Sequence, residues 1–363
     1  MSNLPPMGQL KGLVLSGGAG TRLRPITHTS AKQLVPVANK PVLFYGLEAL
    51  RDAGIREVGI IVGDTRDEIE EAVGDGSRFG LEITIIPQAA PLGLAHAVLT
   101  AEGFIGDSPF VMYLGDNLLR DGITALVDEF RVNAPDAMIL LQHVPNPEHY
   151  GVAELDGGRV VRLVEKPQEP RSDLALVGVY MFTPAIFESA KAIEPSARGE
   201  LEITDAIQHL VDRGLRVDPH VVSGWWKDTG QLADMLEANR LILDVIPHRI
   251  DGDLDADSTV EGRVVIEAGA RLVRSAVRGP AIIGAGAVIE DSYIGPYSAV
   301  SAGCVVSRAE IEHSILLEGS EIRDLDARVE SSLIGRGVTI VRSDGKPRAY
   351  RFLVGDSSAI GLI

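Results

Sequence analysis

The sequence predicts an α/β protein in which a mostly parallel sheet, covered by helices, is followed by a parallel β-helix. Two patterns lead to this fold class. Short apolar runs alternate with helical segments over roughly the first 245 residues, as is typical of parallel sheets with helices on both faces. From about Val260 onward the helical periodicity disappears, and apolar residues recur at a spacing of six, which is the mark of a parallel β-helix.

The predicted strands and helices of the first half follow one another in order. Apolar strands are predicted at 12–16, 57–63, 81–87 and 110–117, and helices at 42–54, 65–76 and 93–104. In the first helix Leu43, Leu47 and Leu50 fall on one face, as a helix packed on a sheet requires. Ligands of such sheets bind beyond the carboxyl ends of the strands. We therefore expect the site around "GGAGTRLRP" and "LGDN", which both follow strands.

The second half carries the six-residue repeat at Ile282, Val288, Ile294, Val300 and Val306. One inward residue per short face is expected of each coil. The stretch 244–258 reads as the junction between the two architectures. We therefore predict a first domain at 8–246, a β-helix domain at 259–345 and a C-terminal tail at 346–363, with the opening "MSNLPPMGQLK" as a short disordered lead whose start, Met1 or Met7, stays open.

Composition narrows the class of partner. The 363 residues include 45% hydrophobic and 23% charged side chains, and the net charge is −17. Such acidity argues against a nucleic acid or an anionic membrane surface as partner. Cys304 is the one cysteine, which excludes an internal disulfide and a cysteine-based metal site and favours a cytoplasmic location. No apolar run reaches the roughly 18 residues of a membrane span.

The glycine-rich loop after the first strand predicts a triphosphate site. It lacks the Gly-Lys-Ser/Thr of a Walker A loop, and Leu23 stands where the dinucleotide fingerprint needs its third glycine. Backbone amides in a glycine turn can still cradle phosphates. Arg22 and Arg24, with Lys32 within ten residues of them, concentrate cations beside this turn in an acidic protein. A tight turn with surface arginines is the alternative.

The stretches "GGAGTRLRPIT" and "SAKQLVPVANKP" resemble the signature of the sugar nucleotidyltransferases, within them the glucose-1-phosphate thymidylyltransferases. The long form of that family carries a hexapeptide β-helix, so the resemblance covers nearly the whole chain. It implies a Rossmann-like nucleotidyltransferase domain and a left-handed β-helix. Further matches follow in order: "PQAAPLGLAHAV", "LGDN", "HYGVAEL", "VEKP", "ALVGVYMF", "SARGELEITD" and "WWKDTG". His96 stands where the family often has glutamine.

The resemblance implies roles for individual residues. The catalytic cations would be Arg22, Lys32, Lys166 and Arg198. The nucleotide would be bound by Leu15, Gly17, Gly18, Gly20, Thr21, Gln88 and Gly93, with Gln88 and the Gly93 backbone reading the pyrimidine. The sugar phosphate would be bound by Asp116, Gly151, Glu165, Lys166 and Val177, and a metal ion by Asp116 and Asp228.

The implied reaction is attack of a sugar-1-phosphate oxygen on the α-phosphorus of a nucleoside triphosphate, with release of pyrophosphate. The nucleophile is already an anion, so catalysis depends on positioning and charge neutralisation. Two aspartates bridging to a triphosphate suit Mg²⁺. The expected substrates are dTTP, with UTP open, and glucose-1-phosphate, and we expect a homo-oligomer assembled through the β-helix.

Two rival functions remain open on the sequence. Hexapeptide β-helices often serve as acyltransferases with a catalytic histidine, and His313 is the histidine within the repeats. A bifunctional nucleotidyltransferase and acyltransferase acting on an amino-sugar phosphate is therefore the first alternative. A regulatory protein that binds nucleotide sugars without catalysis is the second, and the complete set of Arg22, Lys32, Asp116 and Asp228 argues against it.

Overall fold

The computed structural model describes residues 9–18, 20–342, 345 and 350–362. Most of the predicted lead, the domain start at residue 8 and part of the tail at 346–363 lie outside these residues. Packing divides the chain into two units. Unit 1 comprises Met1–Ala19, Ala31–Leu34 and Leu43–Asp228, and unit 2 comprises Gly20–Ser30, Val35–Val42 and Thr229–Ile363. The domain boundaries predicted from the sequence stay predictions.

Unit 1 is built on a nine-stranded sheet among the described residues. Its strands are β1 (Lys11–Ser16), β4 (Glu57–Val62), β5 (Glu82–Pro87), β6 (Phe110–Leu114), β8 (Ala137–His143), β9 (Gly151–Asp156), β10 (Arg159–Glu165), β11 (Leu174–Phe182) and β12 (Val217–Val221). The main path runs β10-β9-β11-β6-β1-β4-β5, and β8 pairs with β11 and β12.

The parallel half of this sheet is confirmed, because β1 is parallel to β4 and β6, and β4 to β5. The other half is mixed: β11 is antiparallel to β6, β8 and β9, and β9 to β10. The expectation of strand-helix alternation to about residue 245 was therefore too regular. Gly157 and Gly158, both at positive φ, join β9 to β10 directly, so no crossover helix separates them.

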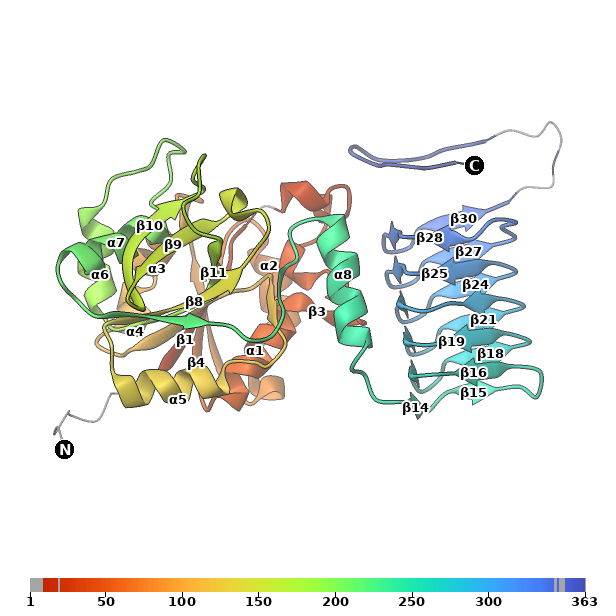
Figure 1. Ribbon diagram of the computed structural model, residues 1–363. Helices are drawn as coiled ribbons and strands as arrows, with labels where there is room; N and C mark the ends of the chain where they lie inside the picture. Colours follow the sequence, from red (N-terminus) through yellow and green to blue (C-terminus); the bar gives the residue numbers. More distant parts are fainter. Residues whose placement is uncertain (1–8, 19, 343–344, 346–349, 363) are drawn as a thin grey trace. The chain divides into compact units, whose positions relative to one another are not determined.

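Helices cover both faces of the sheet. They are α1 (Val42–Asp52), α2 (Arg66–Val73), α3 (Leu94–Thr100), α4 (Glu102–Ile105), α5 (Thr124–Asn133), α6 (Ala185–Ala192) and α7 (Ile203–Asp212). In β1, Leu13 and Leu15 pack in one core cluster with α3, α6 and α7, whereas Val14 packs in another with α1, α2 and α5. Successive residues of one buried strand thus serve opposite faces, and Figure 1 shows these helices on the two sides of the sheet.

Unit 2 contains a stack of short parallel strands that form three sheets, as a parallel β-helix does (Figure 1). The first sheet has β14 (Arg249–Ile250), β17 (Val264–Ile266), β20 (Ala281–Ile283), β23 (Ser298–Val300), β26 (Ile315–Leu316) and β29 (Leu333–Ile334). The second has β15 (Asp253–Leu254), β18 (Arg271–Val273), β21 (Val288–Glu290), β24 (Val305–Ser307), β27 (Glu321–Arg323) and β30 (Thr339–Val341). The third has β16 (Thr259–Glu261), β19 (Ala276–Arg278), β22 (Tyr293–Ile294), β25 (Glu310–Glu312) and β28 (Val329–Glu330).

The inward residues differ in part from those expected. Ile294, Val300 and Val306 lie in the β-helix core as predicted, but the core residues of β20 and β21 are Ile283 and Ile289, each one position after the predicted one. The register pairs Ile266 with Ile283, and Ile283 with Val300, so such a coil is one residue shorter than three exact hexapeptides. An exact spacing of six therefore loses register along the repeat.

Segments far apart in sequence hold one turn within unit 2. The hairpin of β2 (Pro36–Val37) and β3 (Lys40–Pro41) turns at Ala38–Asn39, which we call the anchor turn. Asn239, fully buried on α8 (Leu232–Leu243), accepts a hydrogen bond from Ala38 N at 2.9 Å and donates one to Tyr297 O at 2.9 Å. Asn39 donates to the carbonyl of Val300 in β23 at 2.8 Å. The anchor turn is thus fastened to α8 and to the β-helix.

The C-terminal tail packs little of its apolar surface. Its described residues 350–362 are all exposed, Leu353 completely so. The rings of Tyr350 and Phe352 stack on one another. The apolar side chains of these residues therefore contact each other or solvent. No helix among the described residues is long and apolar enough to cross a membrane.

Candidate active site

The carboxyl ends of β1, β4, β5 and β6 share one edge of the sheet, because these strands are parallel. Gly17 follows β1, Gln88 follows β5 and Asp116 follows β6 at this edge. Gly115 keeps the end of β6 close to β1: its N–H donates to the carbonyl of Leu15 at 2.9 Å. A Cβ at Gly115 would lie 3.0 Å from that oxygen, so a larger residue would push Asp116 away.

Three predicted residues meet at this edge. The Lys32 ammonium hydrogen-bonds Asp116 Oδ2 and lies 3.5 Å from Asp228 Oδ1. The lysine side chain is 7% exposed and the two carboxylates 21% and 28%. Each residue comes from a different segment: Lys32 from a 3₁₀ turn, Asp116 from the loop after β6, and Asp228 from β13 (Trp226–Asp228). A cation thus lies between two carboxylates.

This donor set fits a divalent cation. Mg²⁺ takes one or two carboxylates and completes its shell with phosphate oxygens and water. Asp116 and Asp228 supply that number, and no cluster of three or more His, Cys, Asp or Glu side chains arranged for a metal occurs among the described residues. The remaining ligands of a metal held by these two aspartates would therefore come from a phosphorylated substrate and from water.

The charge state of Asp116 follows from its neighbours. Burial by itself would raise the pKa of this carboxyl, but the Lys32 ammonium outweighs it, with help from hydrogen bonds from Lys32 and Asn117. The pKa of Asp116 is therefore held below its ordinary value. A carboxylate that stays ionised at neutral pH is the form that can hold a metal ion.

A second cluster lies where β9 begins. Gly151, the first residue of β9, pairs with Glu165, the last residue of β10. Arg198 Nη1 lies 3.5 Å from Glu165 Oε1 and 3.3 Å from Glu202 Oε1, and Lys166 Nζ lies 3.8 Å from Glu165 Oε1. The structure thus brings together four residues that are predicted to bind one ligand: Gly151, Glu165, Lys166 and Arg198.

Glu165 is an unusual member of this cluster. Burial, together with the nearby Glu202 carboxylate, raises the pKa of Glu165 above its ordinary value, although Lys166, Arg198 and Thr204 act in the opposite direction. Gly151 leaves the room beside it, since a Cβ there would come within 2.6 Å of Thr204 Cγ2 and 3.0 Å of Glu165 Oε2. The carboxyl is thus partly desolvated, and it has its place because residue 151 carries no side chain.

The two clusters are adjacent along β11. Val179–Phe182 pair with β6, whereas Ala175 pairs with Val152 of β9 on β11. The stretch around Val177 therefore spans the gap between the end of β6, which leads to Asp116, and the start of β9. The side chain of Val177 is fully buried in the core, so contact with a ligand there would have to come from its backbone.

The predicted base-binding residues also lie close together. Gln88 Nε2 and His96 Nδ1 are 2.8 Å apart, and a Cβ on Gly17 would lie 3.3 Å from Gln88 Oε1. Gly93 has a φ of 107°, and a Cβ there would lie 2.4 Å from the carbonyl oxygen of Leu201. Gly93 is therefore needed for chain packing, whatever it contacts in a ligand.

The rest of the glycine loop belongs to unit 2. Gly20 adopts a left-handed φ of 60° and caps the 3₁₀ turn Thr21–Leu23, and its carbonyl accepts bonds from Leu23 N at 3.0 Å and Thr27 Oγ1 at 2.7 Å. The side chains of Thr21 and Arg22 are exposed. The structure thus gives the loop an ordered turn with Arg22 at its surface, and the role of Arg22 stays a prediction.

Two polar residues at the edge were missed by sequence reasoning. Gln33 is 3% exposed, and its Oε1 accepts no hydrogen bond from the described residues. Its Nε2 lies 3.9 Å from where a Cβ on Gly18 would be. Asn117 is 2% exposed and hydrogen-bonds Asp116. Both are neighbours of predicted residues, in "SAKQL" and "LGDN", and that adjacency is the one signal the sequence offers.

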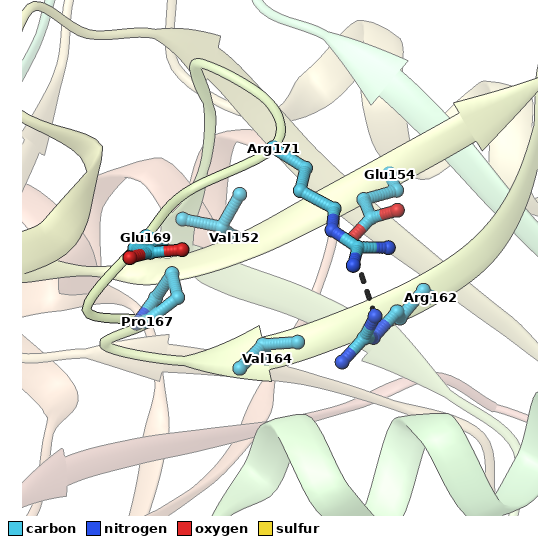
Figure 2. A pocket seen from close by; sticks show the side chains of 7 residues that line it. All are labelled: Val152, Glu154, Arg162, Val164, Pro167, Glu169 and Arg171. Atoms are coloured by element: carbon cyan, nitrogen blue, oxygen red, sulfur yellow. Dashed lines mark ion pairs between the residues drawn. The ribbon is translucent and has the colours of Figure 1, made fainter.

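One surface pocket lies away from the residues predicted for the site. A hollow of about 60 Å³ on β9 and β10 (Figure 2) is lined by Val152, Glu154, Arg162, Val164, Pro167, Glu169 and Arg171. Figure 2 marks its ion pair, between Arg162 Nη1 and Glu154 Oε1 at 3.9 Å. It is far smaller than the several hundred Å³ that a drug-sized ligand needs, and none of the predicted site residues lines it.

Comparison with known proteins gives matches over most or nearly all of the chain. Residues 11–245 match the nucleotidyl transferase family. The chain is 59% identical over 355 residues to a glucose-1-phosphate thymidylyltransferase of Streptomyces antibioticus, covering 97% of this chain and 99% of the relative. It is 49% identical to a low-salt glycan biosynthesis nucleotidyltransferase of Haloferax volcanii over 358 residues, 97% of this chain and all of the relative.

Solved structures resemble about two thirds of the chain. A Bacillus anthracis crystal structure described as a glucose-1-phosphate thymidylyltransferase in complex with a sucrose matches with a TM-score of 0.62 and 36% identity, covering 66% of this chain and 98% of that one. A UDP-glucose pyrophosphorylase complexed with UDP-glucose matches with a TM-score of 0.59 and 28% identity, over 65% and 98% of the two chains.

Proposed function

This chain belongs to the nucleotidyl transferase family, and from that premise we propose that it acts as a glucose-1-phosphate thymidylyltransferase. The reaction joins dTTP and glucose-1-phosphate to give dTDP-glucose and pyrophosphate. A phosphate oxygen of the sugar forms a bond to the α-phosphorus, and the bond from that phosphorus to the β-phosphate oxygen breaks. The observation that carries this proposal is the Lys32 ammonium between Asp116 and Asp228.

Charge neutralisation is the main task of such a site. The attacking oxygen already carries charge, so no general base has to remove a proton. Two polyanions must instead approach each other, which fixed cations at the reacting phosphorus make possible. We assign Lys32 to the triphosphate, together with Arg22 and the backbone of Leu15, Gly17, Gly18, Gly20 and Thr21.

The metal is expected at the two aspartates. Asp116 and Asp228 would hold Mg²⁺, and when bound this ion would supply positive charge to the phosphate oxygens around the α-phosphorus. The lowered pKa of Asp116 keeps its carboxylate ready for a cation at neutral pH. Lys32 lies between the two carboxylates and offsets their mutual repulsion.

The sugar phosphate is assigned to the second cluster. Lys166 and Arg198 would hold the phosphate, while Glu165 and the backbone at Gly151 and Val177 would bind sugar hydroxyls. In the described structure Arg198 is held by three glutamates, Glu165, Glu200 and Glu202. These carboxylates hold the guanidinium in place, and an incoming phosphate would compete with them for it.

At the base side, Gln88 and the Gly93 backbone would read the pyrimidine. His96 stands where the family that the sequence resembles often has glutamine, and it bonds Gln88. We assign dTTP because of the resemblance to thymidylyltransferases over nearly the whole chain.

The test is transfer by purified protein with dTTP or UTP and several hexose-1-phosphates, measured as pyrophosphate release. We expect dTTP with glucose-1-phosphate to react fastest. Asp116→Asn should lower the rate about a hundredfold and be partly rescued by more Mg²⁺. Asp107→Asn, at an exposed site, is the matched control and should behave as wild type. A normal rate for Asp116→Asn would reject the assignment.

The acyltransferase alternative is not favoured. His313 has a buried Nε2 without a hydrogen-bond partner among the described residues, and its Nδ1 lies 3.4 Å from Ser331 Oγ. A catalytic imidazole would have to present a nitrogen to its substrate. Incubation with acetyl-CoA and an amino-sugar phosphate should accordingly give no acyl transfer. Pyrophosphate release by the protein alone would exclude a purely regulatory role.

Three further assignments accompany this function. We propose that the parallel β-helix is left-handed, as in the long form of the family, and that it supports a homo-oligomer. We also propose a cytoplasmic location, for which the support is the single cysteine, Cys304, buried in the β-helix core as a thiol. Light scattering of the purified protein measures the number of subunits directly.

A further inference from the structure

Asn117 sits at the centre of the Asp116 site without having been assigned a role in it. Its side chain is 2% exposed. The amide Nδ2 donates to Asp116 Oδ1 at 2.8 Å, and the amide oxygen accepts a hydrogen bond from the indole N–H of Trp226. An indole N–H can only donate and a carboxylate can only accept. The two partners therefore allow one orientation of the amide between them.

The backbone ties the same two segments together. β7 (Asn117–Leu119) and β13 are antiparallel, with Asp228 opposite Asn117 and Trp226 opposite Leu119. The segment that carries one aspartate is thus paired residue by residue with the segment that carries the other. Trp226 and Asn117 add a side-chain bond between these two strands.

Neighbouring residues fit around this pair. The ring of Trp226 meets that of Tyr150 edge-on at 5.3 Å, and the hydroxyl of Tyr113 donates to the Asn117 carbonyl at 3.3 Å. A Cβ at Gly178 would lie 2.5 Å from Asn117 Oδ1, so a glycine there makes room for the amide. Tyr150, Tyr113 and Gly178 therefore surround the hydrogen-bonded side chains of Asn117 and Trp226.

We propose that Asn117 and Trp226 are a positioning pair for the reaction: the indole fixes the amide, and the amide fixes the rotation of the Asp116 carboxylate. One oxygen of Asp116 is committed to Asn117, and the other, Oδ2, faces Lys32. This inference rests on the proposed function, in which Asp116 holds a metal ion. Residues that orient a metal ligand in this way usually change metal affinity or activity 10–100-fold when removed.

The decisive variant is Trp226→Phe, which removes the indole N–H and keeps a ring against Tyr150. Mn²⁺ serves as the probe, with its affinity for the full-length protein measured by electron paramagnetic resonance without turnover. We expect Mn²⁺ to bind about tenfold more weakly and kcat to fall 10–100-fold. The KM for glucose-1-phosphate should change less than about twofold, because the phenylalanine ring keeps the contact with Tyr150, the residue next to Gly151 of the sugar cluster.

The neighbouring tryptophan provides the matched control. Among the described residues the indole N–H of Trp225 makes no side-chain hydrogen bond, and Trp225→Phe should leave Mn²⁺ affinity at the wild-type value. Asn117→Leu removes both side-chain bonds at similar volume and should weaken Mn²⁺ binding as much as Trp226→Phe or more. If the two residues act as one unit, the double variant should be no weaker than Asn117→Leu alone.

Wild-type Mn²⁺ affinity in a folded Trp226→Phe protein, with weakened binding in Asp116→Asn, would overturn the positioning pair and leave the proposed function standing. Wild-type affinity in Asp116→Asn itself would overturn both. Should Trp226→Phe fail to fold, Asn117→Leu decides by the same measurement. Equal losses in Trp225→Phe and Trp226→Phe would also reject the proposal, since they would point to packing alone.

Discussion

At the scale of single residues, Lys32 is the side chain on which the site depends most. It neutralises Asp116 and Asp228 in the described structure and is assigned to the triphosphate. We predict that Lys32→Ala lowers turnover about a hundredfold, since a charged contact in the transition state is worth roughly 3 kcal/mol. Steady-state rates of pyrophosphate release measure this effect.

The effect of this substitution on stability should be smaller. Lys32 itself is buried, but the carboxylates of Asp116 and Asp228 keep 21% and 28% of their surface exposed, so water can solvate them after the ammonium is removed and the loss should be on the order of 1 kcal/mol. Lys191→Ala, which breaks an exposed ion pair with Glu102, is the control for general effects of losing a lysine. Arg22→Ala should likewise lower turnover far more than stability. Near-normal rates for both Lys32→Ala and Arg22→Ala would reject the triphosphate assignment.

Glu165 gives a prediction about pH. Its pKa is raised in the folded protein by burial and by Glu202, so folding favours the protonated form. The stabilisation is complete below the ordinary glutamate pKa of about 4.3 and is lost as pH rises through the higher folded pKa. We predict that Glu165→Gln matches wild type in acid and becomes the more stable protein towards neutral pH. Urea unfolding at pH 4 to 8 measures this difference, and a constant difference across that range would contradict it.

At the scale of loops and strands, two glycines of the predicted site should respond differently to a methyl group. Gly93 has a positive φ and a backbone oxygen 2.4 Å from a Cβ, whereas Gly18 meets nothing closer than Gln33 Nε2 at 3.9 Å. Gly93→Ala should destabilise the fold by about 3 kcal/mol through overpacking and backbone strain.

Gly18→Ala is the matched comparison. It should keep the unfolding free energy within about 0.5 kcal/mol, as substitutions away from tight packing do, and raise the KM for the nucleoside triphosphate. Chemical denaturation and initial rates separate the two effects. Equal stability of the two variants would show that the close approach of Leu201 to Gly93 does not constrain the chain.

The sequence predicted best those strands whose residues all have the same surroundings. The buried strands at 12–16 and 57–63 were predicted because a strand covered on both faces is apolar throughout, and the strand at 81–87 was predicted from its apolar run although it lies at the edge of the sheet and is partly exposed. The mixed half of the sheet was not predicted, since β11 joins strands from three distant segments and periodicity carries no information on pairing. In the β-helix the repeat was recognised, but coils that are not exact multiples of six shifted Ile283 and Ile289 away from the expected positions.

The candidate site was likewise predicted in part. Motif resemblance selected Lys32, Asp116 and Asp228, and the structure brings them together. It could not reveal that Val177 turns its side chain into the core, or that Asn117 bridges Asp116 and Trp226. Those facts depend on the orientation of side chains across strands that are paired only in the folded chain.

At the scale of the whole molecule, the unit that contains the β-helix also includes two short segments from near the start of the chain. The segments on either side of Ala31–Leu34, which carries Lys32, belong to the unit that contains the β-helix. Ser30 Oγ accepts a bond from Arg336 at 3.1 Å, and Asn39 bonds Val300. A chain ending at Pro247 lacks Val300 and Arg336 and therefore loses both contacts. It keeps the hydrogen bond between Ala38 N and Asn239.

We predict that this shortened chain retains measurable nucleotidyl transfer, because the assigned catalytic residues all precede residue 230. It should be less stable to heat or change its number of subunits. A folded protein with unchanged subunit number and no activity would show that the β-helix contributes to the site. Asn39→Gly in the full chain is the control: it keeps the left-handed φ of 61° accessible and removes only the side-chain bonds of the anchor turn.

The anchor turn also sets an order of events during synthesis. Ala38 and Asn39 leave the ribosome early, whereas Asn239 and Val300, which hold them, are made only after all of unit 1. At about 5–20 residues per second, the wait is on the order of ten seconds or more. Throughout that time the hairpin on the C-terminal side of Lys32 lacks its hydrogen bonds to Asn239 and Val300, and the anchor turn gains the second of them only when the last third of the chain is made.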